Sequence, residues 1–237
     1  MTQILYGKNP VQEALKAKRR RFIEIYISEK SEAPELIKSA GVPVKKIAKE
    51  KLDQLTEGAL HQGIAARVEG FAYSSIEEVT RGDKTFLLIC DSLQDPQNLG
   101  AIARSAYAFG VDALVLAKDR SVEVTPAVSK ASAGAIEHLP VVKVTNLSRM
   151  MADLKEQGFW FYAADASAAQ NLSEMSPSPK MGIVIGSEGE GIRPLVLKNC
   201  DFRFKIRLPR PFDSLNVAQA ASIILYEFTC QNRTGVV

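Results

Sequence analysis

Three short segments, far apart in the chain, hold the residue types best suited to chemistry. They are residues 98–104 (Asn-Leu-Gly-Ala-Ile-Ala-Arg), 185–192 (Ile-Gly-Ser-Glu-Gly-Glu-Gly-Ile) and 207–218 (Arg-Leu-Pro-Arg-Pro-Phe-Asp-Ser-Leu-Asn-Val-Ala). Each segment joins an apolar run typical of a strand to a run typical of a helix, through residues that suit an exposed turn. Because ligands of open α/β sheets bind where strands end, we expect the three turns to meet at one ligand site.

The first segment offers an amide and a guanidinium. Asn98 and Arg104 stand six residues apart, so one lies near the start of the predicted helix and the other nearly two turns further on. Asn98 could also be the helix cap. Arg104 is surrounded by small and apolar residues, and an unpaired guanidinium buried against them would be costly, which favours a functional role. A guanidinium stays protonated, so it suits phosphate binding and alkoxide stabilisation better than proton abstraction.

The second and third segments combine glycine with polar residues. The glycines of residues 186–191 allow the backbone to approach a ligand closely, but no glycine or alanine stands at the third glycine position of the dinucleotide fingerprint. A nicotinamide-dependent oxidoreductase is therefore disfavoured. Glu188 could serve as a turn residue, whereas Ser214 and Asn216 could cap the predicted helix 217–228. That helix has an apolar face that could be buried within one subunit or between two.

Composition excludes several classes of protein. Only two histidines and three widely spaced cysteines are present, so we expect no metal site and reduced cysteines in the core. No apolar run reaches the roughly 18 residues of a membrane span, and the first residues do not form a secretory signal, so a cytoplasmic protein is predicted. Residues 1–82 carry 14 Lys and Arg against 11 Asp and Glu, and the remaining residues carry 16 of each. The basic clusters at 16–21 and 45–51 suggest phosphate contacts, although solvated helix ends would look the same.

The periodicity predicts two α/β domains. Residues 1–72 alternate helix and strand, residues 73–83 form the predicted linker, and residues 84–237 form a regular βα domain with a buried, mostly parallel sheet. Strands of this larger domain are expected at 86–90, 113–116, 141–144, 159–163, 181–185 and 202–206, and helices at 99–109, 126–133, 147–157, from 194, and at 217–228.

In order and spacing, the three segments resemble the signature motifs of the SpoU (TrmH) family of RNA ribose 2′-O-methyltransferases, within the SPOUT superfamily. Residues 130–140 also look like a family segment, and residues 5–14 and 61–64 look like the front domain of its ribosomal guanosine branch. The resemblance covers roughly the whole chain. It implies a trefoil knot in the larger domain, an RNA-binding front domain akin to certain ribosomal proteins, and a homodimer formed by the final helix and the first-motif region.

The resemblance also implies roles for single residues. It implies catalytic roles for Asn98, Arg104, Glu188, Ser214 and Asn216. It also implies that Gly186, Leu208 and Leu215 contact the cofactor S-adenosyl-methionine. The expected reaction is 2′-O-methylation of a guanosine in 23S ribosomal RNA. The loop 209–213 is shorter and stiffer than is usual in the ribosomal branch, so transfer RNA or another ribosomal site stays open as a target. A non-catalytic ribosome assembly factor is the other alternative, and the joint presence of the five polar residues argues against it.

Overall fold

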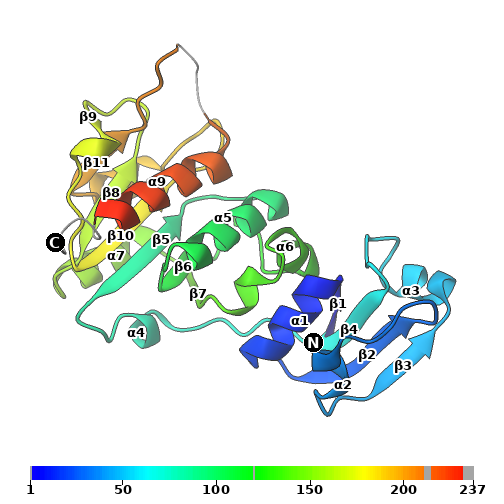
Figure 1. Cartoon of the computed structure of the whole chain (residues 1–237). Helices are drawn as coiled ribbons and strands as arrows, with labels where there is room; N and C mark the ends of the chain where they lie inside the picture. The colour runs from blue at the N-terminus through cyan, green and yellow to red at the C-terminus, as the bar shows by residue number, and fades with distance from the viewer. Residues whose placement is uncertain (1, 120, 211–214, 232–237) are drawn as a thin grey trace. The chain divides into compact units, whose positions relative to one another are not determined.

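The chain folds into two compact units, each with its own sheet (Figure 1). The computed structural model describes residues 2–119, 121–210 and 215–231. Residues 230 and 231 are described by their backbone alone. The first unit is Met1–Ala72 with Glu123–His138, and the second is Tyr73–Val122 with Leu139–Val237. Residues 123–138 therefore pack with the front unit, although they lie within the range predicted for the larger domain.

The first unit is a sheet of four strands in the order β1-β4-β2-β3. The strands are Thr2–Tyr6 (β1), Phe22–Ser28 (β2), Val44–Ile47 (β3) and Ile64–Glu69 (β4). The helices are Lys8–Ala17 (α1), Glu35–Lys38 (α2), Lys49–Leu55 (α3) and Pro126–Ala131 (α6), with a 3-10 turn at Ala135–Glu137 (η1). Alternate residues of a strand point to opposite faces. Accordingly, Ile25 packs with α1 and α2 on one face, and Tyr26 packs with α3 on the other.

The second unit is built on a sheet of seven strands in the order β7-β6-β5-β10-β8-β11-β9. The strands are Thr85–Cys90 (β5), Ala113–Ala117 (β6), Val141–Val144 (β7), Trp160–Ala164 (β8), Gln170–Asn171 (β9), Lys180–Ile185 (β10) and Phe202–Lys205 (β11). All pairings between these strands are parallel in the described residues. The predicted α/β class with a parallel sheet is confirmed.

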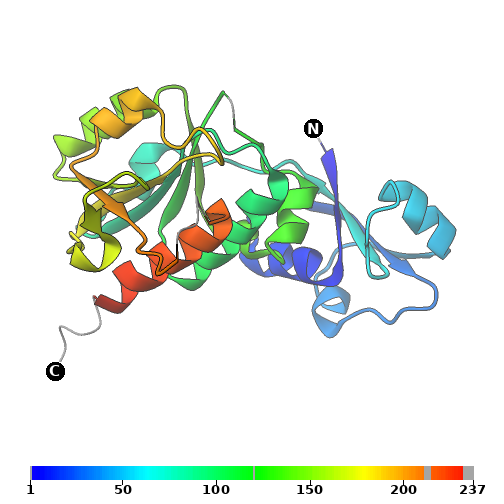
Figure 2. The ribbon, with the colours of Figure 1, turned by 90° about the horizontal axis from the view of Figure 1, so that it is seen from above.

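Helices cover both faces of this sheet, as Figure 2 shows. They are Ile76–Val79 (α4), Pro96–Ala108 (α5), Leu147–Lys155 (α7), Pro194–Lys198 (α8) and Val217–Gln231 (α9), with a 3-10 turn at Leu172–Glu174 (η2). Phe161 faces the core formed with α4, α7 and α8. Its neighbour Tyr162 points the other way and meets Phe228 of α9 edge-on, with ring centroids 5.2 Å apart. Helices α5 and α9 lie side by side on that second face (Figures 1 and 2).

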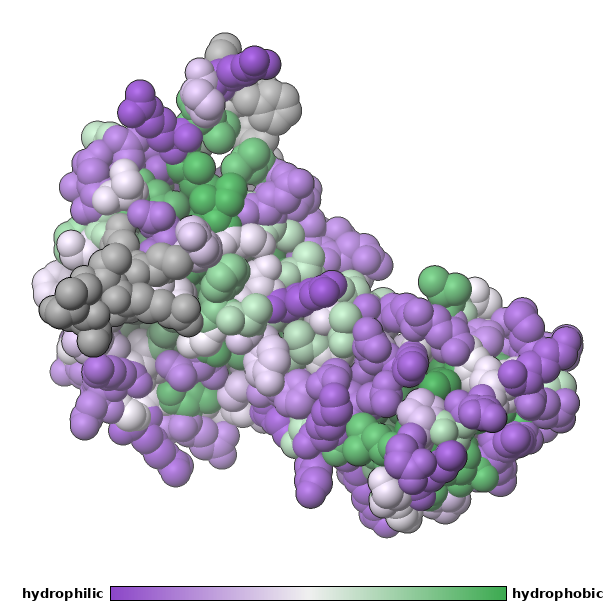
Figure 3. Space-filling view, in the orientation of Figure 1, coloured by the Kyte–Doolittle hydropathy of each residue, from purple (hydrophilic) through white to green (hydrophobic). Residues whose placement is uncertain are grey.

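The apolar face of α9 is buried within its own unit. Val217, Ala221, Ile224, Leu225 and Phe228 are all buried, so this face is not the surface offered to a second subunit. Exposed large side chains on the two neighbouring helices are Tyr107 of α5 at 49%, and Ile223 and Tyr226 of α9 at 42% and 56%. The surface over α5 and α9 is mostly pale or green in Figure 3. In the described part of the chain no helix is both long and apolar enough to span a membrane. The trefoil knot stays a prediction.

Candidate active site

The crevice that should bind a ligand lies where β5 and β10 end. The two strands are parallel neighbours, and the chain runs from β5 through β6 to β7 on one side, while β8, β9 and β11 lie on the other side of β10. The order of strands therefore reverses between β5 and β10, which is the place where open α/β sheets bind ligands. The first turn of α5, the helix that follows β5, carries Asn98, and the loop after β10 carries Glu188.

The loop after β10 is a tight turn that only glycine permits. Ser187 and Gly191 exchange backbone hydrogen bonds of 3.2 and 3.1 Å, which closes the loop on itself. A Cβ on Gly186 would lie 2.1 Å from the carbonyl carbon of Gly191, so no other residue fits there. Gly189 and Gly191 have φ angles of 91° and 68°, a region that L side chains avoid. This backbone holds Glu188 at the exposed tip.

One carboxylate oxygen joins all three segments that the sequence singled out. Glu188 Oε1 accepts hydrogen bonds from Asn98 Nδ2 at 3.2 Å, Asn216 Nδ2 at 2.7 Å and the backbone N–H of Val217 at 3.4 Å. Asn216 Nδ2 also donates to Asn98 Oδ1 at 3.0 Å. Within the part of the chain that the structure describes, Glu188 Oε2 accepts none. The cluster is therefore an exposed, ordered set of polar groups with one carboxylate oxygen to spare.

The alternative roles as helix caps are now settled for two residues. Asp95 caps α5 by accepting the N–H groups of Gln97 and Asn98, so Asn98 is not the cap. Asn216 Oδ1 accepts the N–H groups of Ala218 and Gln219 at the start of α9, while its amide nitrogen binds Glu188. Asn216 thus caps its helix and belongs to the cluster at the same time.

A half-buried ion pair near this cluster was missed by the sequence analysis. Asp91, fully buried at the end of β5, accepts hydrogen bonds from the backbone N–H and the Nε of Arg193, at 2.8 and 2.7 Å. The same two loops are thus joined twice: at the base by Asp91 and Arg193, and at the tip by Asn98 and Glu188. An aspartate directly after a predicted strand and an arginine directly before a predicted helix were the available signals.

The remaining predicted site residues lie apart from this cluster. Arg104 is exposed on α5 and makes no hydrogen bond or ion pair with another described residue, so the expected burial cost does not apply to it. Six residues of helix separate Arg104 from Asn98 by about 9 Å along the helix axis and place the two side chains on different sides of the helix. Leu208 and Leu215 are half-buried. Ser214 lies outside the described residues.

A cavity of about 510 Å³ opens beside the cluster. The residues that line it are Ser92, Leu93, Gln94, Asp95, Asn98, Ser187, Glu188 and Glu190. Its lining contains three carboxyl groups and no lysine or arginine, so it attracts cationic groups and repels phosphate. Any nucleic acid that reaches this cavity must have its phosphates held by side chains from elsewhere.

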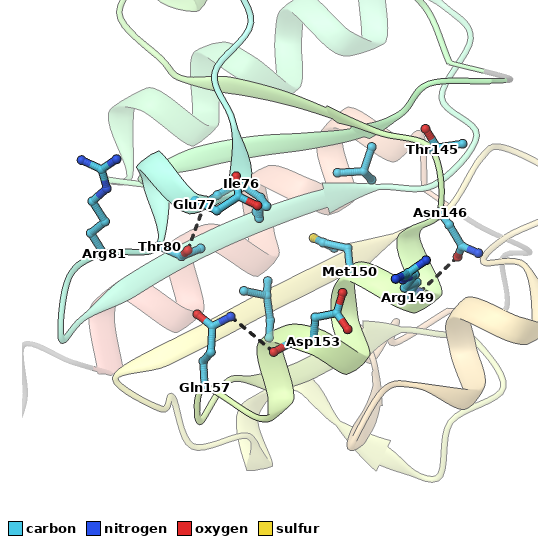
Figure 4. A pocket seen from close by; sticks show the side chains of 12 residues that line it. Ile76, Glu77, Thr80, Arg81, Thr145, Asn146, Arg149, Met150, Asp153 and Gln157 are labelled. Atoms are coloured by element: carbon cyan, nitrogen blue, oxygen red, sulfur yellow. Dashed lines mark hydrogen bonds between the residues drawn. The ribbon is translucent and has the colours of Figure 1, made fainter.

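A larger cavity of about 590 Å³ lies between α4 and α7 (Figure 4). Met150 and Asp153 of α7 line it, whereas Arg81 points away from the other side chains. Acidic and basic residues are present in equal number, and no predicted site residue belongs to it. The smaller cavity is the one whose lining includes predicted site residues, Asn98 and Glu188.

Two known protein families match this chain. Residues 85–226 match the family described as SpoU rRNA Methylase, and residues 4–74 match the family described as RNA 2′-O ribose methyltransferase substrate binding. The chain belongs to the SpoU rRNA methylase family. This confirms the family predicted from the three segments and, with it, an RNA methyltransferase as the class of enzyme.

Individual relatives match over most of their length. A Bacillus subtilis protein named for the TrmH family of tRNA/rRNA methyltransferases, YacO, is 38% identical over 93% of this chain and 92% of its own. A Staphylococcus epidermidis protein named for the same family is 44% identical over 80% of this chain and 78% of its own. The crystal structure of the SpoU methyltransferase AviRb from Streptomyces viridochromogenes, in complex with the cofactor AdoMet, has a TM-score of 0.84 and 21% identity, and covers 98% of this chain and 90% of its own. This last likeness supports the fold.

Proposed function

We propose that this SpoU family protein transfers a methyl group from S-adenosyl-methionine to the 2′-hydroxyl of a guanosine in 23S ribosomal RNA. The observation that carries the proposal is the meeting of three distant segments at Glu188 Oε1. An ordinary surface turn has no need to bind two asparagine amides that lie at the starts of two different helices. Such an arrangement fixes side chains in advance of the reaction, which is how an enzyme lowers a barrier.

The residues of the second and third segments fit the cofactor. S-adenosyl-methionine supplies a methyl group on a positively charged sulfur that leaves as a neutral thioether. The tight turn at Gly186 exposes backbone groups, and the half-buried Leu208 and Leu215 offer apolar surface to an adenine ring. We assign cofactor binding to these three residues. The acidic lining beside them suits a cationic ligand.

Chemistry at the ribose requires a positioned hydroxyl and compensation for the charge that develops on its oxygen. Glu188 fixes the amides of Asn98 and Asn216, which hold the ribose and the neighbouring segment of the site. Arg104 has no ion pair with a described residue, so its guanidinium is available for the phosphate beside the target ribose and for the developing alkoxide. Ser214 keeps its proposed catalytic role on the basis of its segment alone.

The proposal also specifies the target RNA and the oligomeric state. The match of residues 4–74 supports an RNA substrate, and the resemblance to the ribosomal guanosine branch favours 23S ribosomal RNA in the cytoplasm. Transfer RNA is the second candidate, because the relatives are named for both kinds of RNA. We also propose a homodimer through α5 and α9, whose exposed Tyr107, Ile223 and Tyr226 offer apolar surface. Light scattering that finds only monomer at micromolar concentration would reject the dimer.

A methyl-transfer assay tests the reaction. The full chain is incubated with radiolabelled S-adenosyl-methionine and with separated ribosomal and transfer RNA, and the labelled nucleoside is identified. We expect 2′-O-methylguanosine from 23S ribosomal RNA. Label in transfer RNA alone would show that transfer RNA, the second candidate, is the target. Label on a base would refute ribose methylation.

A matched pair of variants ties the activity to the cluster. Glu188→Gln should reduce transfer about 10- to 100-fold, since an amide cannot bind both asparagines through one charged oxygen. Glu190→Gln changes the same charge two residues away, where no hydrogen bond with a described residue is lost, and should cost at most a few-fold. Equal losses in the two variants would show that only the net charge of the turn matters.

A further inference from the structure

Three sequence segments that the proposed reaction does not use meet at one exposed side chain of the front unit. Residues 5–14, 61–64 and 130–140 lie far apart in the sequence, yet Gln62 Oε1 accepts hydrogen bonds from the backbone N–H of Lys8 at 3.3 Å and from Lys130 Nζ at 2.8 Å. Lys8, Gln62 and Lys130 form what we call the Gln62 cluster. Lys8 and Gln62 are exposed, and Lys130 is half-buried.

The backbone around Gln62 is held in an unusual conformation. Gln62 has a φ angle of 52°, in the left-handed region that residues other than glycine rarely adopt. The neighbouring His61 is buried, and its Nδ1 accepts a hydrogen bond from the N–H of Gly63 at 2.9 Å. Its Nε2 therefore carries the proton and donates to Asp53 Oδ1 at 2.7 Å. These bonds keep Gln62 at the surface in one orientation, and such local strain is typical of functional sites.

The position of Lys130 is fixed equally well, because the segment that carries it is packed into the front unit. A Cβ on Gly134 would lie 2.6 Å from the Cβ of Glu13, so only glycine allows α1 to pack this closely. Three residues on, Glu137 binds the guanidinium of Arg20 through both of its oxygens, at 2.7 and 3.0 Å. Lys130 thus reaches Gln62 from a rigid support.

The hydrogen-bond pattern decides which groups face outward. Both partners of the Gln62 amide oxygen are donors, so the amide NH₂ group points away from them. The cluster consequently presents the NH₂ group of Gln62 and the ammonium group of Lys130 as donors, and Lys8, which contacts Gln62 through its backbone, is an exposed lysine. Neither Lys8 nor Lys130 has an ion pair with a described residue, and burial lowers the pKa of Lys130, so an anion would stabilise its ammonium.

The more conspicuous basic cluster, at residues 16–21, is largely used within the protein. Lys16 pairs with Glu13, the buried Arg20 with Glu137, and the exposed Arg21 with Glu69. Their charges are therefore compensated before any RNA arrives. The count of basic residues in the sequence does not show which of them can meet a phosphate, whereas the pairing does.

We propose that the Gln62 cluster binds a phosphate of the RNA backbone and so helps the front unit to hold its substrate. The inference rests on the proposed function, because it takes RNA as the partner. An amide donor beside an ammonium group matches phosphate oxygens, and contacts of this kind position a nucleic acid without reading its sequence.

The sharpest test is Gln62→Glu in the full chain, with large-subunit ribosomal RNA stripped of protein as the probe. The carboxylate keeps an oxygen for Lys8 and Lys130, so the internal bonds survive, while the outward NH₂ donor is replaced by negative charge. We expect about a tenfold loss of RNA affinity with no fall in melting temperature. Unchanged RNA affinity would overturn the proposal, because a purely structural Gln62 predicts that result.

Two lysine variants complete the test. Lys130→Gln should weaken binding and lower the slope of log affinity against log salt by roughly one phosphate contact. Lys84→Gln removes an exposed lysine directly before β5 that has no ion pair with a described residue, and it should change neither quantity. Equal effects of the two variants would show a diffuse charge contribution and would reject the cluster.

Failure of this proposal can be separated from failure of the proposed function. Wild-type protein that binds S-adenosyl-methionine and methylates RNA, but whose Gln62→Glu variant binds RNA normally, refutes the cluster alone. Wild-type protein that methylates no RNA refutes the function, and the RNA affinity of the variants still decides the cluster.

Discussion

Two glutamates, one in each unit, join distant parts of the chain in opposite ways. Glu137 is buried with Arg20, each side chain being 1% exposed, and its two oxygens accept three hydrogen bonds, two from Arg20 and one from Ser129 Oγ. Glu188 is exposed at the tip of its loop, and three hydrogen bonds converge on one oxygen while the other has none from the described residues.

The difference separates a carboxylate that builds a fold from one that builds a site. Burial of Glu137 is tolerable only because Arg20 neutralises it and every oxygen is bound, so it has no capacity left for a ligand. Glu188 is exposed and keeps one oxygen without a hydrogen bond from the described residues, which fits the role that we propose for it in organising the neighbouring amides for a substrate. The following predictions challenge this contrast, beginning with the largest effect.

Breaking the buried ion pair of Glu137 and Arg20 should destabilise the front unit strongly. Glu137→Gln leaves the buried guanidinium of Arg20 without its counter-charge, and the expected loss is about 3–5 kcal/mol of unfolding free energy. Urea unfolding measures it. Glu69→Gln is the control, since its pair with Arg21 is exposed and 3.8 Å long and contributes at most about 1 kcal/mol. Similar losses in the two variants would remove the distinction between a buried and an exposed pair.

Arg104→Ala should do the reverse, with a large effect on activity and a small one on stability. Because the side chain is exposed and has no partner among the described residues, unfolding free energy should change by at most about 1 kcal/mol. Loss of phosphate anchoring and oxyanion stabilisation should cost roughly 2–4 kcal/mol in the transition state, or about 30- to 1000-fold in rate. S-adenosyl-methionine affinity, measured by calorimetry, should hardly change. Near-normal methyl transfer would refute the catalytic role.

Asp91→Asn tests how far the arrangement of Asn98, Glu188 and Asn216 depends on the half-buried pair of Asp91 and Arg193. The amide can replace only one of the two carboxylate oxygens that accept from Arg193, so we expect a loss of about 1–3 kcal/mol in stability. Methyl transfer should fall as well, because the loop that carries Glu188 is held less firmly. Full activity in a measurably destabilised variant would show that the tip of the loop is organised without its base.

The smallest effect concerns the cysteine next to Asp91. Burial raises the pKa of the Cys90 thiol to about 12, and it raises that of Cys200 to about 12 as well. A raised thiol pKa keeps the sulfur protonated and unreactive at neutral pH. Mass spectrometry after treatment with iodoacetamide at pH 8 should find Cys90 unmodified in the native protein and modified after unfolding. Rapid native modification would show that the base of the crevice is open to solvent.

Sequence patterns predicted most of this fold, because strands of a buried parallel sheet are short apolar runs that turns and helices interrupt. The strands near residues 86–90, 113–116 and 181–185 lie where they were expected. The candidate site was predicted from its glycines and its amides, since residue types at strand ends are visible in a sequence. The convergence of these amides on a single oxygen of Glu188 was not, because it depends on the register between β5 and β10.

The sequence was least informative about partners across long separations. Nothing local shows that residues 123–138 pack with the front unit, or that Arg20 in a basic run is buried against Glu137, 117 residues away. The apolar face of α9 likewise gave no sign of whether it meets its own sheet or a second subunit, and it meets its own sheet. Which residues pair and which are buried depends on the folded chain. The periodicity of a sequence shows only that an element has an apolar face, and not what that face packs against.

The most direct test of the central claim maps 2′-O-methyl groups in RNA from cells with and without this protein. The account predicts that one guanosine of 23S ribosomal RNA loses its 2′-O-methyl group in the deficient cells. Wild-type protein should restore the group, and a Glu188→Ala variant produced at the same level should not. An unchanged set of 2′-O-methyl groups in every RNA, or full restoration by the variant, would contradict the assignment of the cluster of Asn98, Glu188 and Asn216 as the site of methyl transfer.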